Sequence, residues 1–120
     1  MNTSDKRNFR RVAFSAGAHI EHGGVSYPGR IIDIALKGAL LEFETLPPIS
    51  RGDGVDLAIQ LHGTELVLSF GTTVAHLEGN KGGFSFSTSD VESLTHLRRL
   101  LELNIGDPEL VSQELANWLE

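Results

Sequence analysis

Two arginines stand four residues apart in a basic run near the start of the chain, and their side chains suit a ligand that carries phosphates and purines. Arg7 and Arg11 belong to the run Lys6-Arg7-Asn8-Phe9-Arg10-Arg11, which holds four of the ten Lys and Arg residues of the protein. A guanidinium is planar, so it can bind a phosphate or the O6/N7 edge of a guanine through two parallel hydrogen bonds, and it can stack on a base. The run predicts an anion-binding arm; the alternative is a solvated basic terminus.

A carboxylate and a glycine form a second candidate site in the stretch Asp33-Ile34-Ala35-Leu36-Lys37-Gly38. We expect a strand to end at Asp33 and a tight connection to lead into the next strand. Asp33 can accept hydrogen bonds from the N1–H and N2–H2 edge of a guanine, or from an arginine. Gly38 permits a positive φ and the close approach of a ligand or another backbone. The alternative is an ordinary turn, since Asp and Gly are common in turns.

His76 is a third candidate, because it ends an expected long strand just before a glycine-rich turn. An imidazole at this place can stack on a base or donate a hydrogen bond to it, and the alternative is a surface strand residue. The other histidines lack the spacing typical of a helical zinc site, so we predict no metal. The chain has neither a Gly-x-Ser-x-Gly elbow nor a phosphate loop, and we predict neither an enzyme nor a cofactor.

The composition restricts the class of protein. The chain has 120 residues, of which 40% are hydrophobic, and a formal net charge of −6. This length suits one domain, and the negative charge argues against bulk nucleic-acid or anionic-membrane binding. No cysteine is present, which excludes disulfides and thiolate metal sites. Without a signal peptide or an apolar run of membrane-spanning length, we expect a cytoplasmic protein.

The elements that must position these residues are mostly strands. Thirteen glycines punctuate short apolar stretches in the first ninety residues, a pattern that favours a closed or nearly closed antiparallel barrel. In the clearest stretch, Val55, Leu57, Ile59 and Leu61 alternate with other residues. The strands are expected at Val12–Glu21, Ser26–Ile32, Ala39–Phe43, Val55–Leu61, Leu66–Leu77 and around Phe84 and Phe86.

The last quarter of the chain changes to a helical period. A first helix is expected at about 90–104, with a capping box in which Ser89 supplies the hydroxyl and Glu92 follows three residues on. Its apolar residues recur at helical spacing: Val91, Leu94, Leu97, Leu101 and Ile105. A second helix is expected at about 108–119, with Asp107 as its cap. We expect both helices to cover the barrel; the alternative is a partner-binding helix.

The two arginines and the later Asp33-x-Ala35-x-x-Gly38, in this order and in a β context, resemble the two signatures of the PilZ domain. The resemblance covers nearly the whole chain. It includes the strand Gly83-Phe84-Ser85-Phe86 and the helical stretch 94–104, which is similar to that of compact stand-alone members. It implies a mainly β fold, a six-stranded antiparallel PilZ-type barrel with C-terminal α-helices packed on it. The expected domains are a flexible basic arm at 1–12 and a single domain at 13–120, with the barrel at about 13–88.

The resemblance also implies a function, that of a bacterial receptor for the second messenger cyclic di-GMP. In the family pattern the arginines of the first motif bind guanine edges and phosphates, which assigns these roles to Arg7 and Arg11. Lys6 and Arg10 flank the motif as auxiliary phosphate contacts, with a solvated side chain as the alternative for Arg10. The acid of the second motif reads guanine edges, which assigns that role to Asp33. The glycine permits close approach, which assigns that role to Gly38.

Ala35 departs from the family pattern, in which a serine stands at this position. Alanine supplies no hydroxyl, so one hydrogen bond to the ligand or the turn is lost, and a neutral hydrogen bond contributes about 0.5–1.5 kcal/mol. We therefore expect binding that is weakened by up to about tenfold but not abolished. A variant Ala35→Ser that binds no more tightly than the wild type would contradict this interpretation.

The expected partners are cyclic di-GMP, taken as a stacked dimer because the arm has several arginines, and an effector protein in trans, because no output domain is evident. We expect a monomer that binds neither DNA nor RNA and does not insert into a membrane. One alternative is a ligand-independent interaction module, toward which Ala35 is a partial step. Another is a single-strand nucleic-acid binder, which would need exposed aromatic residues on a basic strand face. Aromatic residues make up only 7% of the chain.

Overall fold

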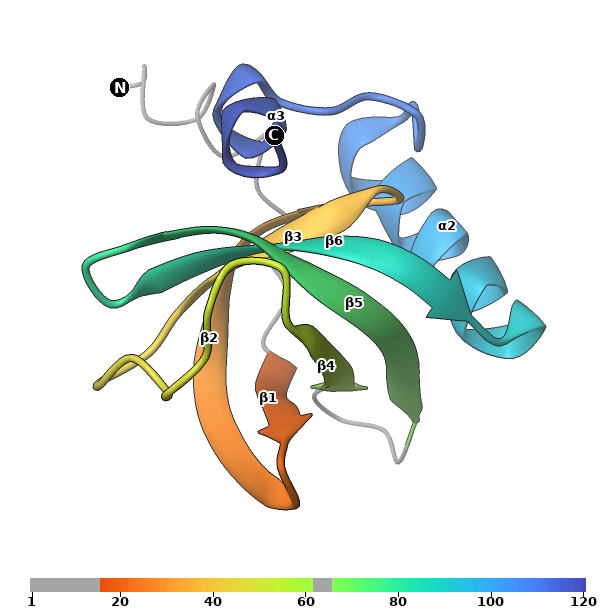
Figure 1. Cartoon of the computed structure of the whole chain (residues 1–120). Coiled ribbons are helices and arrows are strands. Elements are labelled where there is room, and N and C mark those ends of the chain that lie inside the picture. Colours follow the sequence, from red (N-terminus) through yellow and green to blue (C-terminus); the bar gives the residue numbers. More distant parts are fainter. Residues whose placement is uncertain (1–15, 62–65) are drawn as a thin grey trace.

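Six antiparallel strands close into a barrel, as predicted, and their order is β1-β2-β3-β6-β5-β4 (Figure 1). The structure is a computed structural model, and it describes residues 16–61 and 66–120. The strands are β1 (Ala16–His22), β2 (Val25–Ala35), β3 (Gly38–Glu42), β4 (Gly54–Leu61), β5 (Val67–Glu78) and β6 (Lys81–Ser89). The predictions for Lys6, Arg7, Arg10 and Arg11, and for the arm at 1–12, concern residues outside the described part of the chain.

The alternation of apolar residues determines which face of each strand lines the barrel interior. Val55, Leu57 and Ile59 of β4 are at most 4% exposed and belong to the main core, as their spacing predicts. Ile34 of β2 and Phe84 of β6 join the same core. Residues that neighbour these along a strand point to the outer face, since the side-chain period of a strand is two.

Strand β2 is longer than predicted. It continues through Asp33 to Ala35, and the turn to β3 consists of residues 36–37. The pairing of β2 with β3 shifts its register between Ile31 and Asp33, which indicates a bulge. Asp33 is therefore a residue of the strand itself, two positions before its end.

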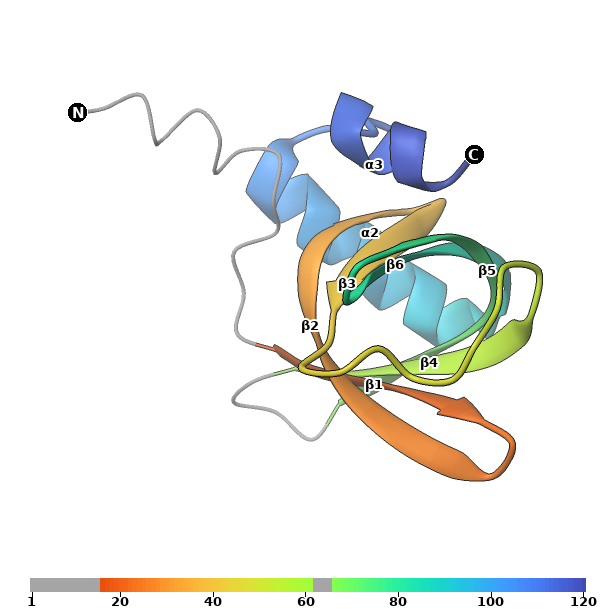
Figure 2. The ribbon, with the colours of Figure 1, turned by 60° about the vertical axis from the view of Figure 1, so that its left-hand side comes forward.

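Helix α2 (Val91–Ile105) begins at a different cap from the predicted one. Asp90 is the N-cap, and its carboxylate accepts a hydrogen bond from the Ser93 backbone N–H at 2.6 Å. Ser89 instead ends β6, so the predicted capping box is wrong. Leu97 and Leu101 are fully buried as predicted, but Val91 is 81% exposed. The helix contacts β5 and lies along the side of the barrel (Figure 2).

Helix α3 (Gln113–Trp118) is shorter than predicted. Ser112 is its N-cap, and Asp107 instead accepts a hydrogen bond from Glu109 N–H at 3.0 Å in a turn that ends before α3 begins. Leu115 is fully buried, whereas Leu110 is 53% exposed. Both views show α3 lying over β3 and β6, which run side by side (Figures 1 and 2). In the parts of the chain that the structure describes, no helix is long and apolar enough to cross a membrane.

Candidate functional site

The residues of the second motif and His76 lie on one face of the barrel wall. Cross-strand pairing places Asp33 opposite Leu40, Leu40 opposite Gly83, and Gly83 opposite His76. Residues that face each other across strands point to the same side of a sheet, so this row from β2 to β5 shares one face. Asp33 and Ala35 are two residues apart and therefore share it as well. We call this the motif face, defined by Asp33, Ala35, Gly38, Gly83 and His76.

Asp33 is buried, although an acid that reads a ligand would be expected at the surface. Its relative exposure is 1%. One carboxylate oxygen, Oδ1, accepts a hydrogen bond from the Ile34 backbone N–H at 2.9 Å. The other, Oδ2, accepts one from the Ser112 hydroxyl at 2.6 Å, and Ser112 is the N-cap of α3. A buried carboxylate is costly unless hydrogen bonds compensate it, so the Ser112 contact ties α3 to the motif face.

Ala35 lies beneath α3 in a small apolar cluster. Ala35, Leu40 and Leu115 are each at most 1% exposed, and Val111, Trp118 and Leu119 pack around them. The methyl group of Ala35 is thus an apolar contact for α3. The hydroxyl that a serine would bring to this position would be surrounded mostly by hydrocarbon while α3 is docked.

Gly38 serves close approach, as predicted, but not a positive φ. Positive φ values in the described residues occur at other glycines and not at Gly38. A Cβ atom at Gly38 would collide with the backbone oxygen of Phe84 and would lie 2.8 Å from Leu119 Cδ2. Gly83 is close to the end of α3, since a Cβ atom there would lie 2.5 Å from the Trp118 carbonyl oxygen. Both glycines let α3 lie directly on the sheet.

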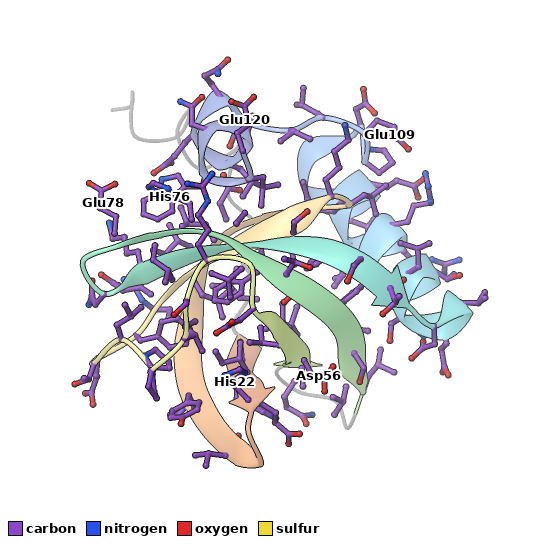
Figure 3. The ribbon with its side chains drawn as sticks, viewed as in Figure 1. His22, Asp56, His76, Glu78, Glu109 and Glu120 are labelled. Atoms are coloured by element: carbon purple, nitrogen blue, oxygen red, sulfur yellow. The ribbon has the colours of Figure 1, made fainter. Side chains whose placement is uncertain are left out.

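His76 contacts the same helix. Its ring is 4.9 Å from the ring of Trp118, measured between centroids, in an edge-to-face arrangement of 81°. Its Nε2 lies 3.5 Å from Glu78 Oε1, and the His76 side chain is 40% exposed. Figure 3 shows His76 and Glu78 toward the side of the barrel where α3 lies, while His22 and Asp56 lie toward the opposite side.

No pattern in the sequence connects Ser112, Trp118 or Leu119 with the motif face. Ser112 and Asp33 are 79 residues apart in the sequence, and no local pattern indicates that they touch. The apolar spacing of the C-terminal residues did indicate a face that packs on the barrel, but not the strand that it would meet. Among the described residues no group of three or more His, Cys, Asp and Glu side chains is arranged to hold a metal ion.

Neither of two open hollows on the barrel surface includes the second motif. One, of about 610 Å³, is lined by residues that include Tyr27, Phe43 and Asn80. The other, of about 640 Å³, is lined by residues that include His19, Asp56 and Asp90. The residues Asp33, Ala35 and Gly38 line neither, which agrees with their burial beneath α3.

Comparison with known proteins places the chain in a family. The model of the PilZ domain matches residues 5–103. Among solved structures, the chain is similar to the PilZ domain of CeSA from a cellulose-synthesising bacterium, with 16% identity, a TM-score of 0.51, and coverage of 75% of this chain and 89% of that one. An uncharacterised Legionella protein matches with 16% identity and a TM-score of 0.48, over 72% of this chain and 83% of that one. At this identity the similarity to the CeSA domain shows the fold alone.

Proposed function

Because the chain belongs to the PilZ domain family, whose members are generally modules that bind cyclic di-GMP, we propose that it is a receptor for this dinucleotide. The observation that carries the proposal is the extent of the family match, since residues 5–103 include both the basic run and the second motif. The clustering of Asp33, Ala35, Gly38 and His76 on one face supports it. PilZ domains act as binding and adaptor modules rather than as enzymes.

The basic segment, residues 6–11, supplies the cationic half of the site. Arg7 and Arg11 bind guanine edges and phosphates, and Lys6 and Arg10 add phosphate contacts. An arginine fork binds such groups with paired charge-assisted hydrogen bonds, which are about twice as strong as neutral ones. The chain as a whole has a net charge of −6, which would repel an anionic ligand. The local concentration of positive charge in the basic segment offsets this repulsion at the site.

The motif face supplies the half that recognises the base. Asp33 accepts hydrogen bonds from the N1–H and N2–H2 groups of a guanine, Gly38 lets the base approach, and His76 stacks on it. The closeness of His76 to Trp118 supports the last role, because the imidazole already packs against an aromatic ring on this face. The several Lys and Arg side chains of the basic segment favour a stacked pair of ligand molecules. A one-to-one ratio in titration calorimetry would contradict that stoichiometry.

The output is a change of surface that an effector protein reads in trans. Bound nucleotide beside the basic segment creates a surface that the free protein does not present. The alternative is a ligand-independent interaction module, which the burial of Asp33 and the alanine at position 35 would favour. The two functions differ in a single measurable property, the affinity for cyclic di-GMP.

Calorimetric titration of the full chain with cyclic di-GMP, GTP and a short oligonucleotide tests the proposal. Of the three ligands, we expect only cyclic di-GMP to bind. We expect Arg7→Ala and Arg11→Ala to lose this binding while circular dichroism shows that their fold is intact. Arg99→Ala is the matched control, because Arg99 is an exposed arginine of α2 outside both motifs. Unchanged affinity in the double variant Arg7→Ala/Arg11→Ala would overturn the assignment, and no binding by the wild type would favour the interaction module.

A further inference from the structure

We propose that α3 and its cap, the segment Ser112–Leu119, compete with cyclic di-GMP for Asp33, so that the free protein is closed and the ligand must displace this segment. The inference rests on the proposed function, because it concerns regulation of the same site. It identifies the C-terminal segment as a tethered competitor. It also gives Ala35 a positive role in place of a missing hydrogen bond.

In its polar part, the competition is for one carboxylate, that of Asp33. Ser112 donates to Asp33 Oδ2 at 2.6 Å, and the same hydroxyl accepts the Leu115 backbone N–H at 3.1 Å. Asp33 is 1% exposed, and the Ser112 hydroxyl occupies its Oδ2 atom. A guanine that donates to Oδ2 would therefore compete with the Ser112 hydroxyl. In doing so it would also separate the helix cap from its anchor.

The apolar part of the competition is the cluster around Ala35. Leu115 is fully buried against Ala35 and Leu40. Burial of a leucine side chain is favourable, and an unpaired hydroxyl in the same place would be unfavourable. Alanine at position 35 therefore favours the closed form, whereas serine, the residue usual in the family, would loosen it. The departure from the family pattern and the docked helix are two aspects of one adaptation.

The space beside Gly38 and Gly83 is already filled. Leu119 lies against Gly38, and the Trp118 backbone lies against Gly83. The end of the segment is tied down separately, since Arg51 Nη2 donates to the Glu120 carbonyl oxygen at 3.3 Å. The room that a ligand would need at these glycines is occupied by the chain's own C-terminal segment.

The segment is suited to release as well as to docking. Helix α3 has six residues, and isolated helices of fewer than about 12–15 residues are marginal in water, so its order depends on the contacts with the barrel. The family match ends at residue 103, before Ser112. The competitor therefore lies outside the matched part of the chain, while its target Asp33 lies inside it.

Because only open molecules bind the ligand, the apparent affinity equals the affinity of the open form multiplied by the fraction of molecules that are open. Ser112→Ala removes the hydroxyl that holds Asp33 and the cap of α3, and we expect calorimetry to show cyclic di-GMP binding on the order of tenfold tighter. Ser87→Ala is the matched control, because the Ser87 hydroxyl donates to the Gly71 carbonyl at 2.9 Å, away from the motif face. Equal or weaker affinity in Ser112→Ala than in the wild type would overturn the proposal.

Trp118 reports the position of α3 directly, since it is the only tryptophan of the chain. With excitation at 295 nm, we expect its emission maximum to move to longer wavelength when cyclic di-GMP saturates the wild type, and to be shifted already in free Ser112→Ala. Calorimetric heat without any movement of the emission maximum would overturn the competition and leave the receptor function standing. Absence of heat in both proteins would overturn the receptor function, and the competition with it.

Discussion

At the residue scale, Gly38 is held by contacts that leave no room for a side chain. A Cβ atom there would meet the Phe84 backbone oxygen and the Leu119 side chain. Because a backbone atom cannot turn aside as a flexible side chain can, Gly38→Ala should strain the pairing of β3 with β6. We expect a loss of about 1–3 kcal/mol in the free energy of unfolding, measured by urea denaturation.

The matched control for Gly38 is Gly17, which lies in strand β1; apart from its chain neighbours, no atom of the described residues lies within 4 Å of an added Cβ. Gly17→Ala should be neutral or stabilise the protein by up to about 1 kcal/mol, because alanine restricts the unfolded chain. A Gly38→Ala protein as stable as Gly17→Ala would show that β3 and α3 adjust to the methyl group without cost.

The second motif could be recognised in the sequence, but the residues that surround it in the fold could not be predicted. The departure at Ala35 was evident, and it led to an expectation of weaker binding. That Ala35 packs on Leu115 became visible only in the fold, because the two residues belong to distant elements. The same holds for Gly38, where close approach was predicted correctly and the positive φ was not.

At the element scale, the cap of α2 makes the stability of the protein depend on pH. A hydrogen bond from the Ser93 backbone N–H, followed by one from the Ser93 side chain, lowers the pKa of Asp90 below its ordinary value. A lowered pKa in the folded protein contributes stability that is present above the unfolded pKa of about 3.9 and is lost as the pH falls through the folded pKa. The cap should therefore stabilise the helix fully at neutral pH and progressively less below about pH 4.

Thermal unfolding of Asp90→Ala tests the cap. We expect a Tm below that of the wild type at pH 7, and a smaller difference between the two proteins at pH 3. Asp90→Asn is the matched control, because asparagine caps helices about as well as aspartate but does not titrate. Its Tm at pH 7 should lie close to that of the wild type. A difference between Asp90→Ala and the wild type that stays constant from pH 7 to pH 3 would contradict the role of the ionised carboxylate.

Element boundaries show where sequence patterns are ambiguous. Ser89 and Asp90 both precede the apolar residues of α2, and the strand β6 takes Ser89 for its own pairing. Asp107 and Ser112 are both suitable caps, and the turn at Asp107 ends before α3 begins. In each case a neighbouring element decides between two residues of similar local preference, which a one-dimensional pattern does not record.

At the scale of the whole molecule, the barrel could be predicted because it follows from local alternation. The six strands were expected from apolar residues at period two between glycine-rich turns, and they close in the predicted antiparallel manner. The closed state of the motif face was not predicted, because it depends on the hydrogen bond between Ser112 and Asp33, 79 residues apart. Local pattern determines the elements, and contacts between distant segments determine whether a site is open.

The charge distribution of the whole chain predicts how salt affects ligand binding. The net charge is −6, yet four of the ten Lys and Arg residues lie in the basic segment. Charges in direct contact with the ligand phosphates act at short range, whereas acids farther than about 10 Å away are already screened at 0.1 M salt. Attraction by the basic segment should therefore outweigh repulsion by the acidic barrel. Raising NaCl from about 0.05 to about 0.5 M should weaken cyclic di-GMP binding by roughly three- to tenfold.

The contribution of the basic segment to this salt effect can be separated by two variants. Lys6→Ala removes one charge beside the first motif but keeps both of its arginines, so calorimetry should show weaker binding and a shallower dependence of log Kd on log salt. Arg99→Ala removes one charge from the exposed face of α2 and should leave the slope unchanged. If the slope fell equally in both variants, the salt effect would come from the net charge of the molecule rather than from contacts with the basic segment.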